Sequence, residues 1–178
     1  METRSQTKVA MQYGLMLGVA GSLVYLIFYF MNADPGSRLP TWIGYLLMIV
    51  FITLGIKSYR DQDLAGYISY GKSLGTGVLV GLFSGIILAA FTVLMFTVID
   101  PGLAEKVLQA SEQKWIESGM GDEEISMAMK WAEKFLTPSF LFVFTLVGNV
   151  FMSVLFSLII SIFMRKESHE HKIEDLLQ

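Results

Sequence analysis

Four long apolar stretches without a charged side chain constrain the fold of this chain more than any other feature. They cover residues 9–31, 41–56, 73–99 and 139–164. A helix needs about 20 mainly apolar residues to cross the hydrocarbon core of a bilayer. The second stretch is short, so we expect its helix to extend to residue 59, with its ends in the interfacial layers. The sequence therefore predicts an all-α, polytopic membrane protein with four transmembrane helices, at about 9–31, 41–59, 73–99 and 139–164.

The composition supports a membrane protein and excludes several other classes. Hydrophobic residues make up 53% and charged residues only 16% of the 178 residues, whereas about a quarter of the residues of soluble domains are charged. The lipid bilayer is therefore the expected surrounding of the chain. The net charge of −3 argues against a nucleic-acid partner, and the absence of cysteine excludes disulfide bonds and thiolate chemistry.

The first apolar stretch has a competing interpretation as a cleaved signal peptide, because Arg4 and Lys8 precede it. The apolar part of a signal peptide has roughly 7–15 residues and is followed by an A-x-A-like cleavage site. The stretch from Val9 to Met31 is longer, and no such site follows it. We therefore expect an uncleaved membrane anchor.

Lysine and arginine predict the orientation of the spans, since cytoplasmic loops carry an excess of these residues. With the N-terminus inside, the cytoplasmic segments hold eight of the 13: Arg4, Lys8, Lys57, Arg60, Lys72, Arg165, Lys166 and Lys172. The outer segments hold the other five: Arg38, Lys106, Lys114, Lys130 and Lys134. We expect both termini, including the charged tail 167–178, to lie in the cytoplasm.

The segment 101–137, between the third and fourth spans, predicts a helical hairpin outside the membrane. Asp100 can cap its first helix, with Pro101 in the first turn, and Asp122 can cap its second helix. Small and apolar residues recur at helical spacing in both halves: Ala104, Val107, Leu108, Ser111 and Trp115, then Ile125, Ala128, Met129, Ala132 and Leu136. We prefer an amphipathic cap on the spans or in the interface, with a docking or ligand-binding lid as the alternative. Acidic residues outnumber lysines here, so anionic lipid is not an expected partner.

Small residues spaced four apart mark two of the spans as packing surfaces. They are Gly14, Gly18 and Ser22 in the first span, and Gly77, Gly81, Gly85 and Ala89 in the third. Such rows let helix backbones approach closely in lipid. We expect them to pack within one chain, with a homodimer face as the alternative. Gly81→Leu should then disrupt packing, whereas Gly81→Ala should be tolerated far better.

The fourth span carries a polar ridge, also with a spacing of four residues. Its members are Thr145, Asn149, Ser153, Ser157 and Ser161. The ridge could join helices through hydrogen bonds or line a polar path. Ion and proton paths are typically marked by ionisable residues within the membrane, and the spans contain none. We therefore prefer the joining role, in which Asn149 is the most demanding side chain.

Catalytic and metal-binding patterns are weak. No nucleophile, zinc or phosphate-binding motif occurs. His169 and His171 lie in the charged tail, where adventitious metal binding is the less favoured interpretation, and Arg60, Asp61 and Asp63 suit a solvated turn. The sequence predicts a protein that is not an enzyme and that has no cofactor.

The linker before the third span has a recognisable signature, formed by Tyr59, Arg60, Asp61, Gly66, Tyr67, Tyr70 and Gly71. Together with the order of four spans and a long helical segment, it resembles the bacterial membrane family of unknown function DUF4199, over roughly residues 8–164. The resemblance implies a small bacterial inner-membrane protein. It implies no catalytic residue and no substrate.

Two functional hypotheses remain from the sequence. The preferred one is a non-enzymatic structural or interaction protein, such as an accessory subunit with a membrane-protein partner. The alternative is a small oligomeric transporter or channel component that uses the polar ridge of the fourth span. A lipid-modifying enzyme ranks third.

Overall fold

The computed structural model describes residues 4–33 and 37–166, and these residues are almost entirely helical. Six α-helices follow one another: α1 (Gln6–Phe30), α2 (Leu39–Ser58), α3 (Tyr70–Leu94), α4 (Leu103–Glu117), α5 (Asp122–Phe135) and α6 (Pro138–Met164). The π-helical turns η1 (Tyr59–Asp63) and η2 (Met95–Ile99) extend α2 and α3. Four of these segments are long and apolar enough to cross a membrane, namely α1, α2 with η1, α3 with η2, and α6. The all-helical class is confirmed, and the four long apolar helices fit a multi-pass membrane protein.

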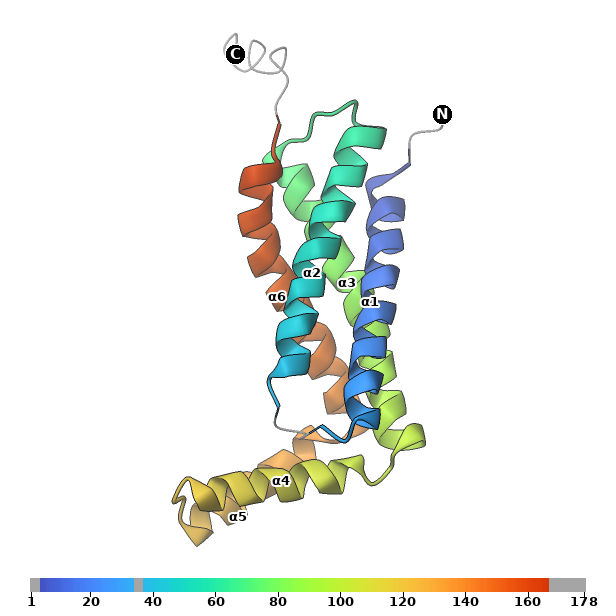
Figure 1. Ribbon diagram of the computed structural model, residues 1–178. Helices are drawn as coiled ribbons and strands as arrows, with labels where there is room; N and C mark the ends of the chain where they lie inside the picture. Colours follow the sequence, from blue (N-terminus) through green and yellow to red (C-terminus); the bar gives the residue numbers. More distant parts are fainter. Residues whose placement is uncertain (1–3, 34–36, 167–178) are drawn as a thin grey trace.

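The four apolar helices form one elongated bundle, and the two polar helices lie across one of its ends (Figure 1). The helices α1, α2, α3 and α6 run along the bundle, and the described chain begins and ends at the opposite end from α4 and α5. We call the end with Arg4 and Lys166 the terminal end, and the end with α4 and α5 the capped end.

The third span, α3, lies at the centre of the bundle. It packs against α1, α2 and α6, and its contacts with α6 and α1 are the most extensive in the molecule. Its small residues Ser73, Gly77, Gly81, Ser84 and Gly85 are buried, because neighbouring helices lie close to them. On α2, Gly55 lets the helix approach α1 and α3 closely, next to Tyr13 and Val80.

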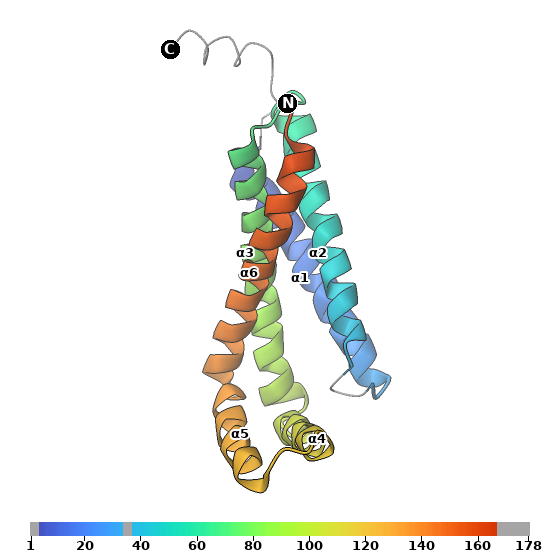
Figure 2. The same ribbon diagram turned by 90° about the vertical axis from the view of Figure 1, so that its left-hand side faces the viewer.

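The main apolar cluster occupies the terminal half of the bundle. Its buried members are Val9, Ala10, Leu17, Met48, Ile52, Ile56, Tyr59, Ile68 and Val80. No residue of α2 before Met48 is buried, and no residue of α6 before Ser153 is buried. Towards the capped end α2 and α6 diverge, as Figure 2 shows. The bundle is therefore tightly packed near its terminal end and open near its capped end.

The polar linker is shorter than the sequence predicted, because both neighbouring helices extend into it. Tyr59, Arg60 and Asp61 belong to η1, and Tyr70 and Gly71 are the first residues of α3. Only residues 64–69 lie between these elements. The chain reverses at Ala65 and Gly66, whose φ angles of 52° and 88° are positive. Ser69 then caps α3, since its hydroxyl accepts a hydrogen bond from the Lys72 amide at 3.4 Å.

The segment 101–137 consists of two helices, but their caps differ from the prediction. Gly102 and Gly121 occupy the N-cap positions, so neither Asp100 nor Asp122 does. The Gly121 amide donates to the Glu124 carboxylate at 3.3 Å, which serves the first turn of α5 in place of the expected aspartate cap. Gly119, with φ 78°, turns the chain between the two helices. The tail 167–178, with His169 and His171, lies outside the described residues.

Candidate functional site

The glycine row of α3 faces the polar ridge of α6, so two patterns that the sequence shows separately are the two sides of one seam. Gly77 lies against Ser157, Gly81 against Ser153 and Gly85 against Asn149. Each step of four residues along α3 is matched by a step of four back along α6, as expected for antiparallel helices in close contact. A Cβ atom on Gly77 would lie only 2.8 Å from the Ser157 Cβ atom. At Gly81 the added Cβ atom would overlap the Ser153 side chain, so even alanine should disturb the packing there, although less than leucine.

Asn149 is the polar link of this seam. Its amide nitrogen donates to the Gly81 carbonyl oxygen at 2.7 Å and to the Ser84 hydroxyl at 2.9 Å. The Ser84 hydroxyl in turn donates to the same Gly81 carbonyl at 3.0 Å. One amide group of α6 is thus bound to two groups of α3, which is the joining role expected for a strongly polar side chain in a span.

The serines of the ridge contribute through their small size more than through hydrogen bonds. Ser153, Ser157 and Ser161 have no exposed surface. The Ser153 hydroxyl donates to the Val150 carbonyl of its own helix, whereas those of Ser157 and Ser161 have no hydrogen-bond partner among the described residues. Thr145, the remaining member, is half-buried towards the capped end. Most of the ridge therefore points into the protein.

The small row of α1 packs against another face of α3. A Cβ atom on Gly14 would lie 2.7 Å from the Val80 carbonyl oxygen, and one on Gly18 would lie 2.6 Å from the Ile87 Cβ atom. The Ser22 hydroxyl donates to the Gly18 carbonyl of its own helix at 2.8 Å. Ser22 also lines a shallow apolar groove between α1 and α3 that is open on one side. Ala89, the last of the α3 row, is fully buried.

At the terminal end, the linker joins the beginning of α1 to the end of α6. Two backbone hydrogen bonds, of 2.9 and 3.0 Å, connect Ile68 with Lys166 in both directions. The Lys166 ammonium lies 5.6 Å from the centre of the Tyr67 ring, and the Tyr70 hydroxyl donates to the Leu158 carbonyl. These contacts hold the end of α6 against the linker.

Arg60, Asp61 and Asp63 of the linker make specific contacts, although Asp61 also remains 40% exposed. The Arg60 guanidinium pairs with Asp61 at 2.7 Å and donates to the Met164 carbonyl at the end of α6. Asp63 accepts from the backbone amide of Arg4 at 2.7 Å and from its guanidinium at 3.0 Å. Of the signature glycines, Gly66 is required by its positive φ, while Gly71 has open space around its Cα atom. Signature residues thus hold the end of α6 against the linker, and Asp63 holds the segment that precedes α1.

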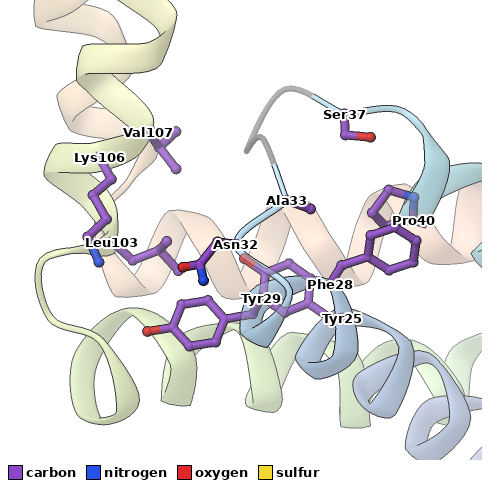
Figure 3. Close-up of a pocket in the computed structure, with 10 residues that line it drawn as sticks. All are labelled: Tyr25, Phe28, Tyr29, Asn32, Ala33, Ser37, Pro40, Leu103, Lys106 and Val107. Carbon is purple, nitrogen blue, oxygen red and sulfur yellow. The ribbon is translucent and has the colours of Figure 1, made fainter.

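A pocket of about 320 Å³ lies at the capped end, where the sequence predicted none. Figure 3 shows its lining: Tyr25, Phe28, Tyr29, Asn32, Ala33, Ser37, Pro40, Leu103, Lys106 and Val107. The lining is mainly apolar, with polar groups of Tyr29, Asn32 and Lys106 towards one end and Phe28 and Pro40 towards the other. The pocket therefore suits a small, mostly apolar group that carries little net charge.

A three-residue network borders this pocket. The Lys106 ammonium and the Tyr29 hydroxyl donate to the same oxygen of Asp100, at 2.7 and 3.0 Å. The side chain of Asp100 is 12% exposed, and that of Lys106 is 59% exposed. The hydrogen bond from Lys106 is the main cause that lowers the pKa of the Asp100 carboxyl, and the same bond raises the pKa of Lys106. Sequence reasoning assigned Asp100 only a capping role, because Tyr29 is 71 residues away and no local pattern connects the two.

Replacement of Asp100 by asparagine tests the network through the pH dependence of stability. Because the pKa of the folded Asp100 lies below its ordinary value of 3.8, its contribution is fully present above that value and is lost as the pH falls through the lowered pKa. We expect the wild type to be more stable than Asp100→Asn near neutral pH, with a difference that shrinks below about pH 4. Thermal unfolding in detergent, from neutral pH to below about pH 4, measures this difference in stability. Glu133→Gln, at an exposed position of α5, should show no such convergence, and a pH-independent difference for Asp100→Asn would contradict the assignment.

The sequence model of a family described as "Protein of unknown function (DUF4199)" matches residues 12–166. The chain belongs to the DUF4199 family. The DUF4199 match includes the linker, both faces of the α3–α6 seam and the residues of the pocket, whereas Arg4, the partner of Asp63, precedes it. No curated protein and no solved structure matches the chain.

Proposed function

We propose that this DUF4199 protein is a non-enzymatic structural or interaction protein of the bacterial inner membrane, acting as an accessory subunit of a membrane complex. The observation that carries the proposal is the use of the polar side chains of the spans. Asn149 and the buried serines of α6 are occupied in the seam with α3. A substrate path would need such groups on a water-filled surface, whereas here Asn149 joins α6 to α3 and the serines are buried inside the protein.

The same observation counts against a pore built around α6 in an oligomer. Ser153, Ser157 and Ser161 have no exposed surface that a second chain could face. The exposed side of α6 carries Phe144, Val147, Phe151 and other large apolar side chains instead. Such a surface suits lipid or the helix of a partner protein.

Purification in a mild detergent, followed by native mass determination, tests the proposal. We expect a particle heavier than the 19.9 kDa chain, because a second copy or another membrane protein accompanies it. Identification of the companion by mass distinguishes these two cases. A protein that remains monomeric under the mildest extraction, and that conducts a solute in vesicles, would contradict the proposal.

The proposed orientation gives a separate prediction. Arg4 bonds to Asp63 and Lys166 bonds to Ile68, so both lie beside the same linker. The excess of lysine and arginine assigns that side of the bundle to the cytoplasm. The chain has no cysteine, so Thr7→Cys and Ser126→Cys form a matched pair of exposed hydroxyl positions at the two ends. In intact spheroplasts, an impermeant maleimide should label Ser126→Cys and should leave Thr7→Cys unlabelled until the membrane is opened. The reverse pattern would overturn the orientation.

A further inference from the structure

The helix α5 has an apolar surface that its packing against the rest of the chain does not use. The predicted apolar stripe of α5 is buried or half-buried at Ile125, Ala128, Met129, Ala132 and Leu136. A second row is exposed: Met127 by 61%, Trp131 by 59% and Phe135 by 43%. These three residues are spaced four apart, so they form one continuous row along the helix. We call them the exposed row of α5.

The exposed row continues directly into the lipid-facing surface of α6. The ring of Trp131 stacks on that of Phe135, with centroids 6.2 Å apart. The Phe135 ring in turn meets Phe140 and Phe144, in the first two turns of α6, at 5.8 and 5.2 Å. Phe140 and Phe144 are themselves exposed. Because α6 is long and apolar enough to span a membrane, these two rings lie at the level where one end of the span reaches the membrane interface, and the exposed row continues from them at that level.

The charges around the row mark the level of the lipid headgroups. The Lys134 ammonium lies 5.0 Å from the centre of the Trp131 ring. Lys130 and Glu133 are exposed on the polar side of the helix, away from the row. Tryptophan at the boundary, with lysine beside it, is the usual arrangement at a membrane–water interface.

We propose that α5 lies in the headgroup layer of the leaflet that α6 enters, with Met127, Trp131 and Phe135 inserted among the upper acyl chains. The occupant of the row is phospholipid and not a second copy of the chain, since the row joins the end of a span and carries tryptophan with lysine beside it, as at a membrane–water interface. The lipid is zwitterionic, because α5 carries four acidic residues against two lysines and repels anionic headgroups. The exposed face of α4, with Glu105, Lys106, Gln109 and Gln113, stays on the water side.

Two single-tryptophan variants in vesicles test the proposal. Trp42→Phe with Trp115→Phe leaves only Trp131, on the exposed row, and Trp42→Phe with Trp131→Phe leaves only Trp115, which is half-buried on α4. The vesicles consist of phosphatidylcholine with bromine atoms at a shallow or a deep position of the acyl chains. We expect strong loss of Trp131 emission with shallow bromine, less loss with deep bromine, and little loss for Trp115 with either.

A substitution pair then links the quenching to the exposed row. In the Trp131-only protein, Phe135→Glu places a charge in the row and should abolish most of the quenching, whereas Ile116→Glu, at an exposed apolar position of α4, should leave it unchanged. Vesicles with added anionic phospholipid should give no stronger quenching than pure phosphatidylcholine. The proposal would be overturned if a water-soluble quencher, and not the bromolipids, reduced the Trp131 emission. It would also be overturned if neither quencher reduced the emission because a dimer shielded Trp131. This inference does not depend on the proposed accessory function.

Discussion

Gly81→Ala should destabilise the bundle, although the substitution adds only one carbon atom. The new Cβ atom would overlap both the hydroxyl and the Cβ atom of Ser153, so α3 and α6 must move apart. Overpacking of a close-packed core costs about 1–3 kcal/mol. The shift also lengthens the hydrogen bond from Asn149 to the Gly81 carbonyl, which is 2.7 Å long. Gly81→Leu should have a larger effect in the same direction. Thermal unfolding of the purified variants in detergent measures both.

Two further variants make this prediction specific to the seam. Gly148, on α6, has no atom within 4 Å of the position of an added Cβ. Gly148→Ala should therefore be neutral, or stabilising by roughly 0.5–1 kcal/mol through its higher helix propensity. Ser153→Gly removes the atoms that a Cβ on Gly81 would meet, so the double variant should recover most of the loss in a double-mutant cycle. An unchanged melting temperature for Gly81→Ala, or a loss of stability that Ser153→Gly does not reduce, would show that α3 and α6 are not in close contact at Gly81 and Ser153.

Asn149→Leu should weaken folding without changing solute flux. The substitution removes both hydrogen bonds to α3 and leaves the Gly81 carbonyl and the Ser84 hydroxyl without the Asn149 amide as a donor. The cost should be on the order of 1–2 kcal/mol, since interhelical hydrogen bonds in membranes are individually modest. Ser157→Ala is the matched control on the same ridge. The Ser157 hydroxyl is buried without a partner among the described residues, so its removal should be neutral or slightly stabilising.

Vesicles that contain an ion- or solute-sensitive dye separate the joining role from a polar path. We expect no leak from vesicles with either the wild type or Asn149→Leu, together with a lower melting temperature for the variant. A wild-type leak that Asn149→Leu abolishes, with unchanged melting, would instead assign the ridge to transport.

The spans could be predicted because lipid acts on each segment separately. Each of the four apolar runs is uncharged, and the observed helices end within a few residues of the predicted limits. The larger differences occur where helices continue through polar sequence. Tyr59 to Asp63 continue α2 as a π-helical turn because the linker residues find partners in other segments, such as Asp63 with Arg4 and Arg60 with Met164. No local sequence pattern predicts such partners.

The small-residue rows were visible in the sequence, but their pairing was not. A spacing of four shows that Gly77, Gly81 and Gly85 can approach another helix, and it shows nothing about which one. The tertiary structure placed the ridge of α6 on this row and the glycines of α1 on a neighbouring face of α3. It also showed that Ser153 fills the space at Gly81, so even an alanine side chain there should disturb the seam.

By itself, the sequence determined the properties that depend on composition and short-range spacing: the helical class, the four candidate spans, and the presence of small and polar rows. Only the tertiary structure decided what depends on distances between remote residues. The Asp100 network joins Tyr29 at the end of α1 to Lys106 in α4. The exposed row of α5 is distinguished from the predicted apolar stripe of the same helix only because the structure buries or half-buries that stripe. In both cases the deciding contacts form where α4 and α5 meet the ends of the spans. The spacing of residues along the chain does not predict these contacts, because it reports only on neighbours within one helix.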